Sequence, residues 1–171
     1  MTLFFVISSF GVIFFSKTKT DYYKLLKKIE PLINFCKKKK IVFVVPYSTY
    51  WANKYKAFGI LLENSDVVLN NLKNILDLNK RFRIVCKVHN YIEAVKKKKI
   101  ADIIFISPVY KTKSHPDQTP LKNYVFLYIC HLLKKKQLFA LGGMNDKNFK
   151  TKNSIFLSGY GGINTFGNDN V

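Results

Sequence analysis

The sequence has almost no arginine: Arg81 and Arg83 are the only two among its 29 basic residues. Arginine makes most of the bidentate contacts to bases and phosphates, so its scarcity argues against a nucleic-acid partner despite a formal net charge of +19. Three lysine runs, at 37–40, 96–99 and 134–136, each follow a helix-like segment, where they complement the helix dipole. A basic surface of this kind still favours phosphorylated ligands.

Cysteine patterns for metal or redox chemistry are also missing. Cys36, Cys86 and Cys130 lie far apart, with no Cys-x-x-Cys pair and no metal-site spacing. Three widely spaced cysteines are typical of reduced thiols in a protein core. We therefore expect a cytoplasmic protein.

The apolar N-terminus, residues 1–15, is shorter than the roughly 20 residues that span a bilayer. A signal-peptide core or a membrane anchor is one interpretation of this segment. Against it, no basic segment comes first, no small-residue cleavage site follows, and Ser8, Ser9 and Gly11 interrupt the run. We favour a strand pair, or a strand remnant followed by a strand at 12–15, and expect no membrane partner.

The chain does contain a regular alternation of short apolar runs and helix-like segments. Continuous apolar runs of this length predict parallel strands that are buried on both faces. The expected strands lie at 12–15, 41–45, 59–62, 82–85, 103–106 and 138–141, with a glycine-rich tail at 155–166. The helix-like segments lie at 21–36, 49–56, 68–78, 91–99 and 121–136. A strand–helix repeat of about 20–25 residues is typical of a (β/α) barrel. We expect one α/β domain over residues 1–171, a TIM (β/α)8-type barrel that lacks or truncates its first strand–helix unit.

Two segments carry most of the functional information, residues 101–121 and residues 138–144. In the first, an apolar strand stops at a Ser-Pro pair and opens into a polar loop that contains Thr112 and Ser114. In the second, an apolar strand stops on paired glycines. Loops that follow parallel strands gather at one edge of the sheet, and α/β proteins bind their ligands there.

Four strand ends occur in a recognisable order and spacing. Residues 57–66 and 84–94 resemble the patterns A-D-G-V-H-L-G-Q-x-D and S-x-H-[NT] with a following E-A. Residues 107–115 resemble G-P-V-[FY]-x-T-x-[ST]-K, and residues 140–144 resemble A-[IL]-G-G-[IM]. Over residues 12–166 the series resembles the thiamine-phosphate synthase and TenI family of small TIM barrels.

The resemblance implies a transferase of thiamine biosynthesis, whose partners are phosphorylated pyrimidine and thiazole substrates. Such an enzyme joins an aminopyrimidine diphosphate to a thiazole phosphate and releases pyrophosphate. Charge that develops as pyrophosphate leaves calls for Mg²⁺ and hydrogen-bond donors. The resemblance implies Asp66 as the Mg²⁺ ligand, and Thr112 and Ser114 near the phosphates or the thiazole. It also implies that the backbone N–H groups of Gly142 and Gly143 bind the thiazole phosphate.

The chain departs from the family pattern at several strand ends. The family's Q-[LI]-R-x-K strand end has no arginine here, and Lys17 or Lys19 is the candidate to replace it. An Asn-Asp pair falls on Pro46 and Tyr47, which removes a metal-binding carboxylate. A strand-end serine falls on Lys87, a second candidate phosphate-binding lysine, and the loop lysine falls on His115.

These departures leave three functions open. The first is the transferase, active or impaired. The second is a TenI-like enzyme that processes the thiazole ring, with His89 as its acid or base, or a non-catalytic binder of phosphorylated ligands. The third is a basic protein that binds nucleic acid or a membrane surface. Structural roles compete for the same residues, because Asp66 and the His89-Asn90 pair are also typical helix caps and paired glycines also serve tight turns.

Overall fold

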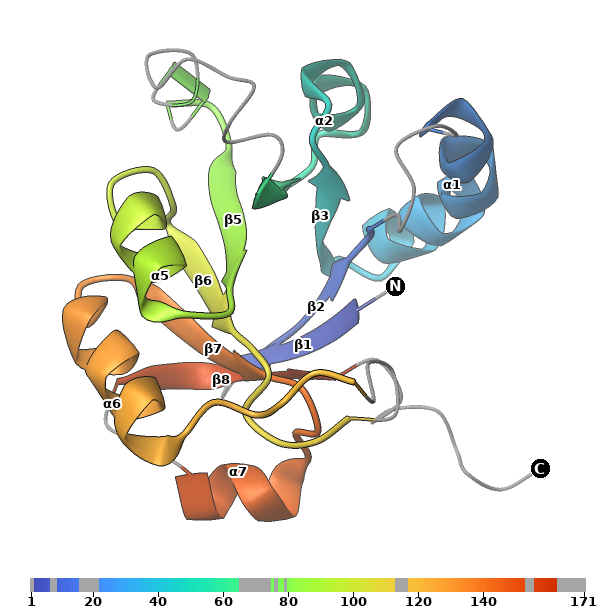
Figure 1. Ribbon diagram of the computed structural model, residues 1–171. Coiled ribbons are helices and arrows are strands. Elements are labelled where there is room, and N and C mark those ends of the chain that lie inside the picture. Colours follow the sequence, from blue (N-terminus) through green and yellow to red (C-terminus); the bar gives the residue numbers. More distant parts are fainter. Residues whose placement is uncertain are drawn as a thin grey trace.

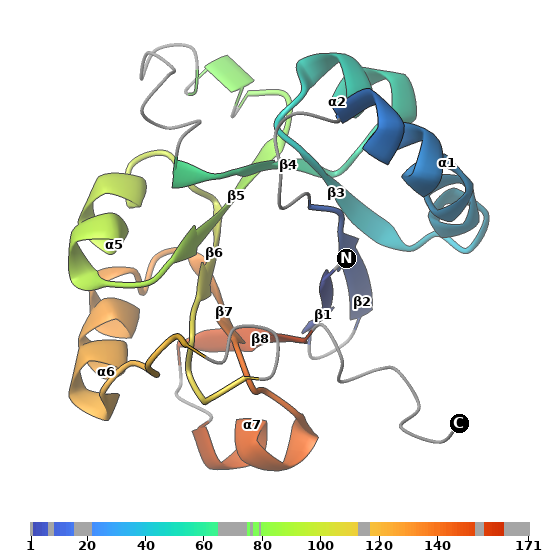
Figure 2. The same cartoon turned by 45° about the vertical axis from the view of Figure 1, so that its right-hand side comes forward.

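The structure is a computed structural model, which describes residues 2–6, 9–15, 22–64, 75, 77–78, 80–112, 117–152 and 156–162 (Figure 1). The strands are β1 (Thr2–Val6), β2 (Ser9–Ile13), β3 (Val42–Pro46), β4 (Gly59–Leu62), β5 (Arg83–Val88), β6 (Ile103–Ile106), β7 (Gln137–Leu141) and β8 (Leu157–Gly162). The helices are α1 (Tyr22–Lys38), α2 (Thr49–Tyr55), α5 (Tyr91–Lys97), α6 (Asn123–Leu132) and α7 (Asp146–Lys152). The eight strands form a closed barrel in sequence order, and the helices lie around its outside (Figure 2).

Strands β2 to β8 all run parallel, and each pairs with the next strand along the chain. This arrangement confirms the expected TIM-type α/β barrel. The helix expected at 68–78 falls largely outside the described residues. Helix α7 was not expected, because its seven residues bury none of their side chains and so show no apolar periodicity.

Strand β1 closes the barrel in the opposite direction from the other strands. It pairs antiparallel with β2 on one side and with β8 on the other, so that Phe4 lies between Gly11 and Gly161. Residues 7 and 8 alone separate β1 from β2, which leaves no room for a helix. The expected absence of the first strand–helix unit is therefore confirmed, and a hairpin takes its place. Closure pairs the edges of β2 and β8 that seven parallel strands alone would leave exposed.

The buried side chains form two groups because successive residues of a strand point to opposite faces. Inside the barrel, side chains such as Val44 and Val85 pack around the rings of Phe105 and Phe139, which stack with centroids 5.0 Å apart. Outside the barrel, the alternate residues pack beneath the helices. Cys36, Cys86 and Cys130 are all buried and form no disulfide.

The described helices give no sign of a membrane span, since none of them is long and apolar enough to cross a bilayer. Residues 2–6 and 9–13 of the apolar N-terminus are strands, which confirms the favoured interpretation of a strand pair. Two of the lysine runs begin in the last turns of α1 and α5, as expected.

Candidate functional site

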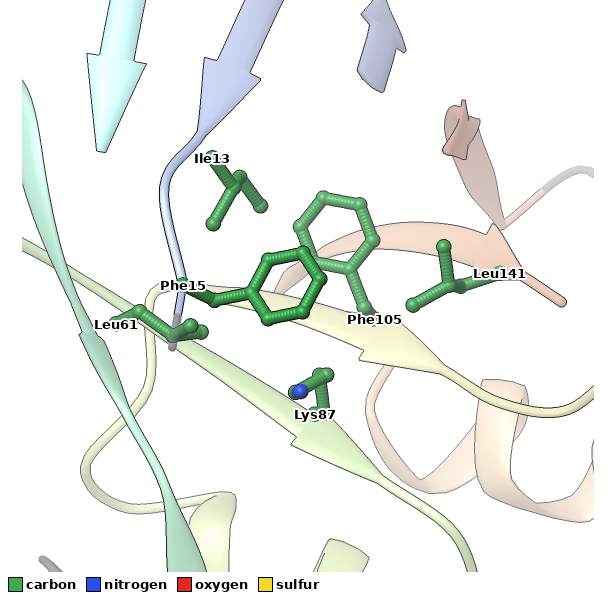
Figure 3. A pocket seen from close by; sticks show the side chains of 6 residues that line it. All are labelled: Ile13, Phe15, Leu61, Lys87, Phe105 and Leu141. Carbon is green, nitrogen blue, oxygen red and sulfur yellow. The ribbon is translucent and has the colours of Figure 1, made fainter. Parts of the chain in front are cut away.

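The carboxyl ends of the parallel strands surround a small hollow, which we call the barrel mouth (Figure 3). Six residues from five strand ends line it: Ile13, Phe15, Leu61, Lys87, Phe105 and Leu141. Five of these side chains are apolar, and Lys87 brings the one charge among them. The barrel mouth therefore offers apolar walls and one ammonium group to a ligand.

Lys87 forms an ion pair with Glu63 at the barrel mouth. Its Nζ lies 3.2 Å from Glu63 Oε1 and 5.4 Å from the centroid of the Phe15 ring. Leu61 and Val85 lie in the barrel interior. Glu63 follows Leu61 by two residues, and Lys87 follows Val85 by two residues. Side chains two apart in a strand share a face. Because β4 and β5 are paired, their ends bring the two charges together.

Behind the barrel mouth, Lys97 ties the ends of β4 and β5 to α5. This lysine is 3 % exposed, and its Nζ donates hydrogen bonds to the side-chain oxygen of Asn64 and to the backbone carbonyl of Lys87. Its Nζ also lies 3.7 Å from a carboxylate oxygen of Glu93. Burial lowers the pKa of the Lys97 ammonium below its ordinary value, because the charged form is poorly solvated. The network holds in place the backbone that carries Lys87.

His89 lies at the end of β5 but does not belong to the cavity lining. Its Nδ1 is 2.9 Å from the backbone oxygen of Ser107. A carbonyl oxygen can only accept a hydrogen bond, so Nδ1 carries the hydrogen, and the lone pair of the neutral ring is on Nε2. The predicted helix cap at this position is confirmed for the neighbouring residue, because Asn90 caps α5 by accepting a hydrogen bond from the N–H of Glu93 at 2.9 Å.

The glycine pair after β7 packs against the loop after β6. Gly142 and Gly143 have positive φ angles of 90° and 62°, a region that favours glycine. A Cβ on Gly143 would lie 2.5 Å from the carbonyl oxygen of Lys111, and one on Gly142 would lie 2.9 Å from Pro108. The N–H of Tyr110 donates to the oxygen of Gly142 at 3.0 Å. The glycines are therefore required for the contact between the two loops, whatever they bind.

Further contacts fix this glycine turn to the first residues of α7. The side-chain amide of Asn148 donates to the oxygen of Gly143 at 2.6 Å. Asn145 and Asn148 each accept the other's backbone N–H, at 2.8 and 2.9 Å. The hydroxyl of Tyr160 on β8 donates to Asp146 at 2.6 Å. Burial and this hydrogen bond raise the pKa of Tyr160 above its ordinary value.

The structure brings the predicted site residues together in part. Lys87 lies in the barrel mouth, and His89 and the Gly142-Gly143 pair lie at nearby strand ends, with Thr112 half-buried in the loop after β6. Lys17, Asp66 and Ser114 fall outside the described residues, so their assignments remain predictions. Sequence reasoning did not assign Glu63 or Lys97 a role. Side chains alternate between the two faces of a strand, and this alternation would have placed Glu63 on the same face as Leu61. Residues four apart in a helix are neighbours, and this spacing would have placed Lys97 beside Glu93.

Among the described residues, no cluster of metal-ligating side chains is assembled. Nowhere in this part of the chain do three or more His, Cys, Asp or Glu side chains gather where they could hold a metal. Glu63 is paired with Lys87, and β3 ends on Pro46, which has no oxygen ligand in its side chain. The predicted ligand Asp66 is outside the described residues.

A family model described as Thiamine monophosphate synthase matches residues 7–163. The chain belongs to the thiamine monophosphate synthase family. The match includes β2 to β8 and the whole barrel mouth, and it confirms the family that the four strand-end motifs indicated.

Two solved structures of thiamine phosphate pyrophosphorylases are similar to this thiamine monophosphate synthase family member. The protein from Pyrococcus furiosus has a TM-score of 0.64 at 18 % sequence identity, over 85 % of this chain and 69 % of that one. The protein from Bacteroides thetaiotaomicron has a TM-score of 0.51 at 16 % identity, over 90 % of this chain and 68 % of that one. At these identities the likeness shows the fold alone. A search of curated proteins finds no match.

Proposed function

We propose that this protein acts in thiamine biosynthesis as a thiamine-phosphate synthase-type transferase. The observation that carries the proposal is a single lysine ammonium, Lys87, held in the apolar mouth of a barrel of this family. The substrates would be an aminopyrimidine diphosphate and a thiazole phosphate. In the reaction, the bond between the pyrimidine methylene carbon and the diphosphate oxygen breaks, and its electron pair leaves with pyrophosphate. The thiazole nitrogen then forms a bond to the methylene carbon.

The chain's own residues support this chemistry in two ways. The apolar walls exclude water and contact the faces of flat rings, with the Phe15 and Phe105 rings among them. In such surroundings the ammonium of Lys87 attracts an anionic group more strongly than it would in water. Lys87 would bind a phosphate oxygen by moving from Glu63, which lies 3.2 Å away.

The direct test is to incubate the purified full chain with both phosphorylated precursors, with and without Mg²⁺. Formation of thiamine phosphate and pyrophosphate, followed by mass spectrometry, is the expected result. Lys87→Met is expected to reduce the rate at least tenfold. Lys54→Met removes an equal charge from an ion pair on α2 and is expected to leave the rate unchanged. The absence of product at enzyme concentrations equal to the substrate would exclude the transferase.

A second candidate is favoured by the chemistry of the ends of β2 and β3. Phe15 lines the barrel mouth, and Pro46 ends β3 with Tyr47 just after it, where the family pattern has an Asn-Asp pair. These residues suit a ring and one phosphate better than a diphosphate. The protein would then bind or process a thiazole phosphate alone, in the manner of TenI, with the unprotonated Nε2 of His89 as the proton acceptor.

Calorimetry distinguishes the two candidates. The second predicts binding of thiazole phosphate that is unaffected by added pyrophosphate, together with no transferase product. If His89 is the proton acceptor, His89→Gln abolishes turnover of the thiazole ring and leaves its binding intact. Competition by pyrophosphate for the same site would contradict the second candidate.

A further inference from the structure

Exposed apolar side chains gather on one face of the barrel, away from the barrel mouth. Eleven large hydrophobic side chains are exposed among the described residues, and six of them are on the two helices α5 and α6. We call these six the helix patch: Tyr91, Ile92, Val95, Tyr124, Leu127 and Tyr128. The two helices lie side by side (Figures 1 and 2), and the rings of Tyr91 and Tyr128 meet with centroids 5.1 Å apart. The helix patch is therefore one continuous surface.

The spacing of the patch residues along each helix places them on one helix face. On α6, Tyr124 and Tyr128 are four residues apart, and Leu127 lies three residues after Tyr124, so all three share one helix face. On α5, Tyr91, Ile92 and Val95 follow the same spacing. Tyr124 and Ile92 remain 68 % and 65 % exposed in the folded chain. Exposed apolar patches rimmed by polar residues mark binding surfaces.

Lysines gather at one end of the helix patch. We call Lys96, Lys98, Lys99, Lys134 and Lys135 the lysine rim, and all five are exposed. The two runs lie beside each other because β6 and β7, which follow them, are paired, and the N–H of Gln137 donates to the oxygen of Asp102 at 3.2 Å. In the part of the chain that the structure describes, the acidic residues near the rim are held by other groups. Glu93 accepts hydrogen bonds from the N–H of His89 and from Asn90, and Asp102 lies 3.7 Å from Arg83.

A second copy of this chain is a poor occupant for the surface. Self-association through this face would bring two lysine rims and two chains of formal charge +19 together, and like charges repel. Stable protein interfaces also use about 20–30 residues on each side, far more than the helix patch provides. The occupant must carry negative charge and accept shallow burial of aromatic and aliphatic groups.

We propose that the helix patch and the lysine rim dock this protein on an anionic lipid surface. Tyrosine rings prefer the boundary between headgroups and acyl chains, where the ring is buried and the hydroxyl stays hydrated. Ile92, Val95 and Leu127 insert beside them, and the lysine rim pairs with anionic headgroups. Sequence patterns predicted no membrane partner, since the surface comes from two helices that only the fold places together. The barrel mouth stays accessible, because the lysine rim is at the opposite ends of the strands.

The test uses co-sedimentation of the full chain with vesicles. Vesicles of phosphatidylglycerol and phosphatidylcholine are compared with pure phosphatidylcholine at low and high salt. We expect at least tenfold stronger binding to the anionic vesicles, weakened by salt. The variant Ile92→Ser/Leu127→Ser and the variant Lys98→Glu/Lys99→Glu are each expected to lose about tenfold in binding. Tyr124→Ser tests the patch independently of the two aliphatic residues.

Matched control variants come from α1. Leu32 is 45 % exposed, as Leu127 is, and Lys38 and Lys39 form an exposed lysine pair at the end of α1. Leu32→Ser and Lys38→Glu/Lys39→Glu are expected to bind as the unmodified chain does. Equal losses in the controls would overturn the proposal, because they would mean attraction by net charge alone. Light scattering that shows a dimer dissociated by the patch variants would also overturn it, in favour of a second copy.

Discussion

The ammonium of Lys87 lies 3.2 Å from the carboxylate of Glu63, where two neighbouring strands end at the barrel mouth. The pair is partly exposed, with 27 % of the Lys87 side chain and 40 % of the Glu63 side chain accessible to solvent. Its contribution to stability is therefore small, below about 1 kcal/mol. Under the proposed function its consequence lies in binding, because an anionic ligand would compete with Glu63 for the same ammonium.

The two single variants of this pair are expected to change ligand affinity in opposite directions. Lys87→Met removes the cation and weakens binding of a thiazole phosphate by about tenfold, a loss of about 1.4 kcal/mol. Glu63→Gln removes the competing carboxylate and tightens binding a few-fold. Titration calorimetry with the phosphorylated thiazole measures both changes. Weakening by both substitutions would show that Glu63 itself contacts the ligand.

Because Lys97 is buried, we expect the free energy of unfolding to depend on pH. Burial lowers the pKa of this lysine in the folded protein, so between that lowered pKa and the ordinary lysine pKa of 10.5 the unfolded chain binds more protons than the folded one. The free energy of unfolding therefore gains a rising contribution from Lys97 as the pH increases through this window toward 10.5. Lys97→Met removes that contribution. It also removes the Lys97 donor from the side-chain oxygen of Asn64 and from the carbonyl of Lys87, at a cost of about 1–3 kcal/mol.

Urea unfolding at several pH values up to 10.5 measures both effects as the difference between the variant and the unmodified chain. Lys96→Met is the matched control, since Lys96 is the exposed neighbour on the same helix. A difference that does not change with pH would show that Lys97 has no perturbed titration.

Gly143→Ala tests the packing of the two loops beside the barrel mouth. The new Cβ would meet the carbonyl oxygen of Lys111 at 2.5 Å, in a backbone conformation with φ of 62°. We expect a loss of about 1–3 kcal/mol in the free energy of unfolding and weaker binding of phosphorylated ligands, because the loop after β6 must move. Lys147→Ala on the exposed face of α7 is the control. Unchanged stability in Gly143→Ala would mean that the two loops separate freely.

Phe4→Pro tests the closure of the barrel by β1. Phe4 pairs with Gly11 in β2 and with Gly161 in β8, so loss of its N–H removes a hydrogen bond from one of the two ladders. We expect a lower melting temperature and faster hydrogen exchange in β2 and β8, whose edges become exposed. Thr2→Pro is the matched control, since a proline is tolerated at the first residue of a strand. Identical exchange in both variants would show that β1 does not stabilise the barrel.

Local patterns were sufficient to predict most of the barrel. The runs at 41–45, 59–62, 103–106 and 138–141 are strands β3, β4, β6 and β7 within a residue or two, because continuous apolar runs between helices have few other stable arrangements. The order and spacing of the strand-end motifs also indicated the family. Helix α7 could not be found in this way, because its residues make no apolar face.

The sequence by itself determined the parallel barrel, its family and the place of the loops after β6 and β7, because those depend on periodicity and on spacing along the chain. Only the tertiary structure decided which side chains meet. It placed Glu63 against Lys87, buried Lys97 beneath both strand ends, and fitted β1 between β2 and β8. The physical reason is that these contacts join residues far apart in the sequence, and barrel closure brings them together.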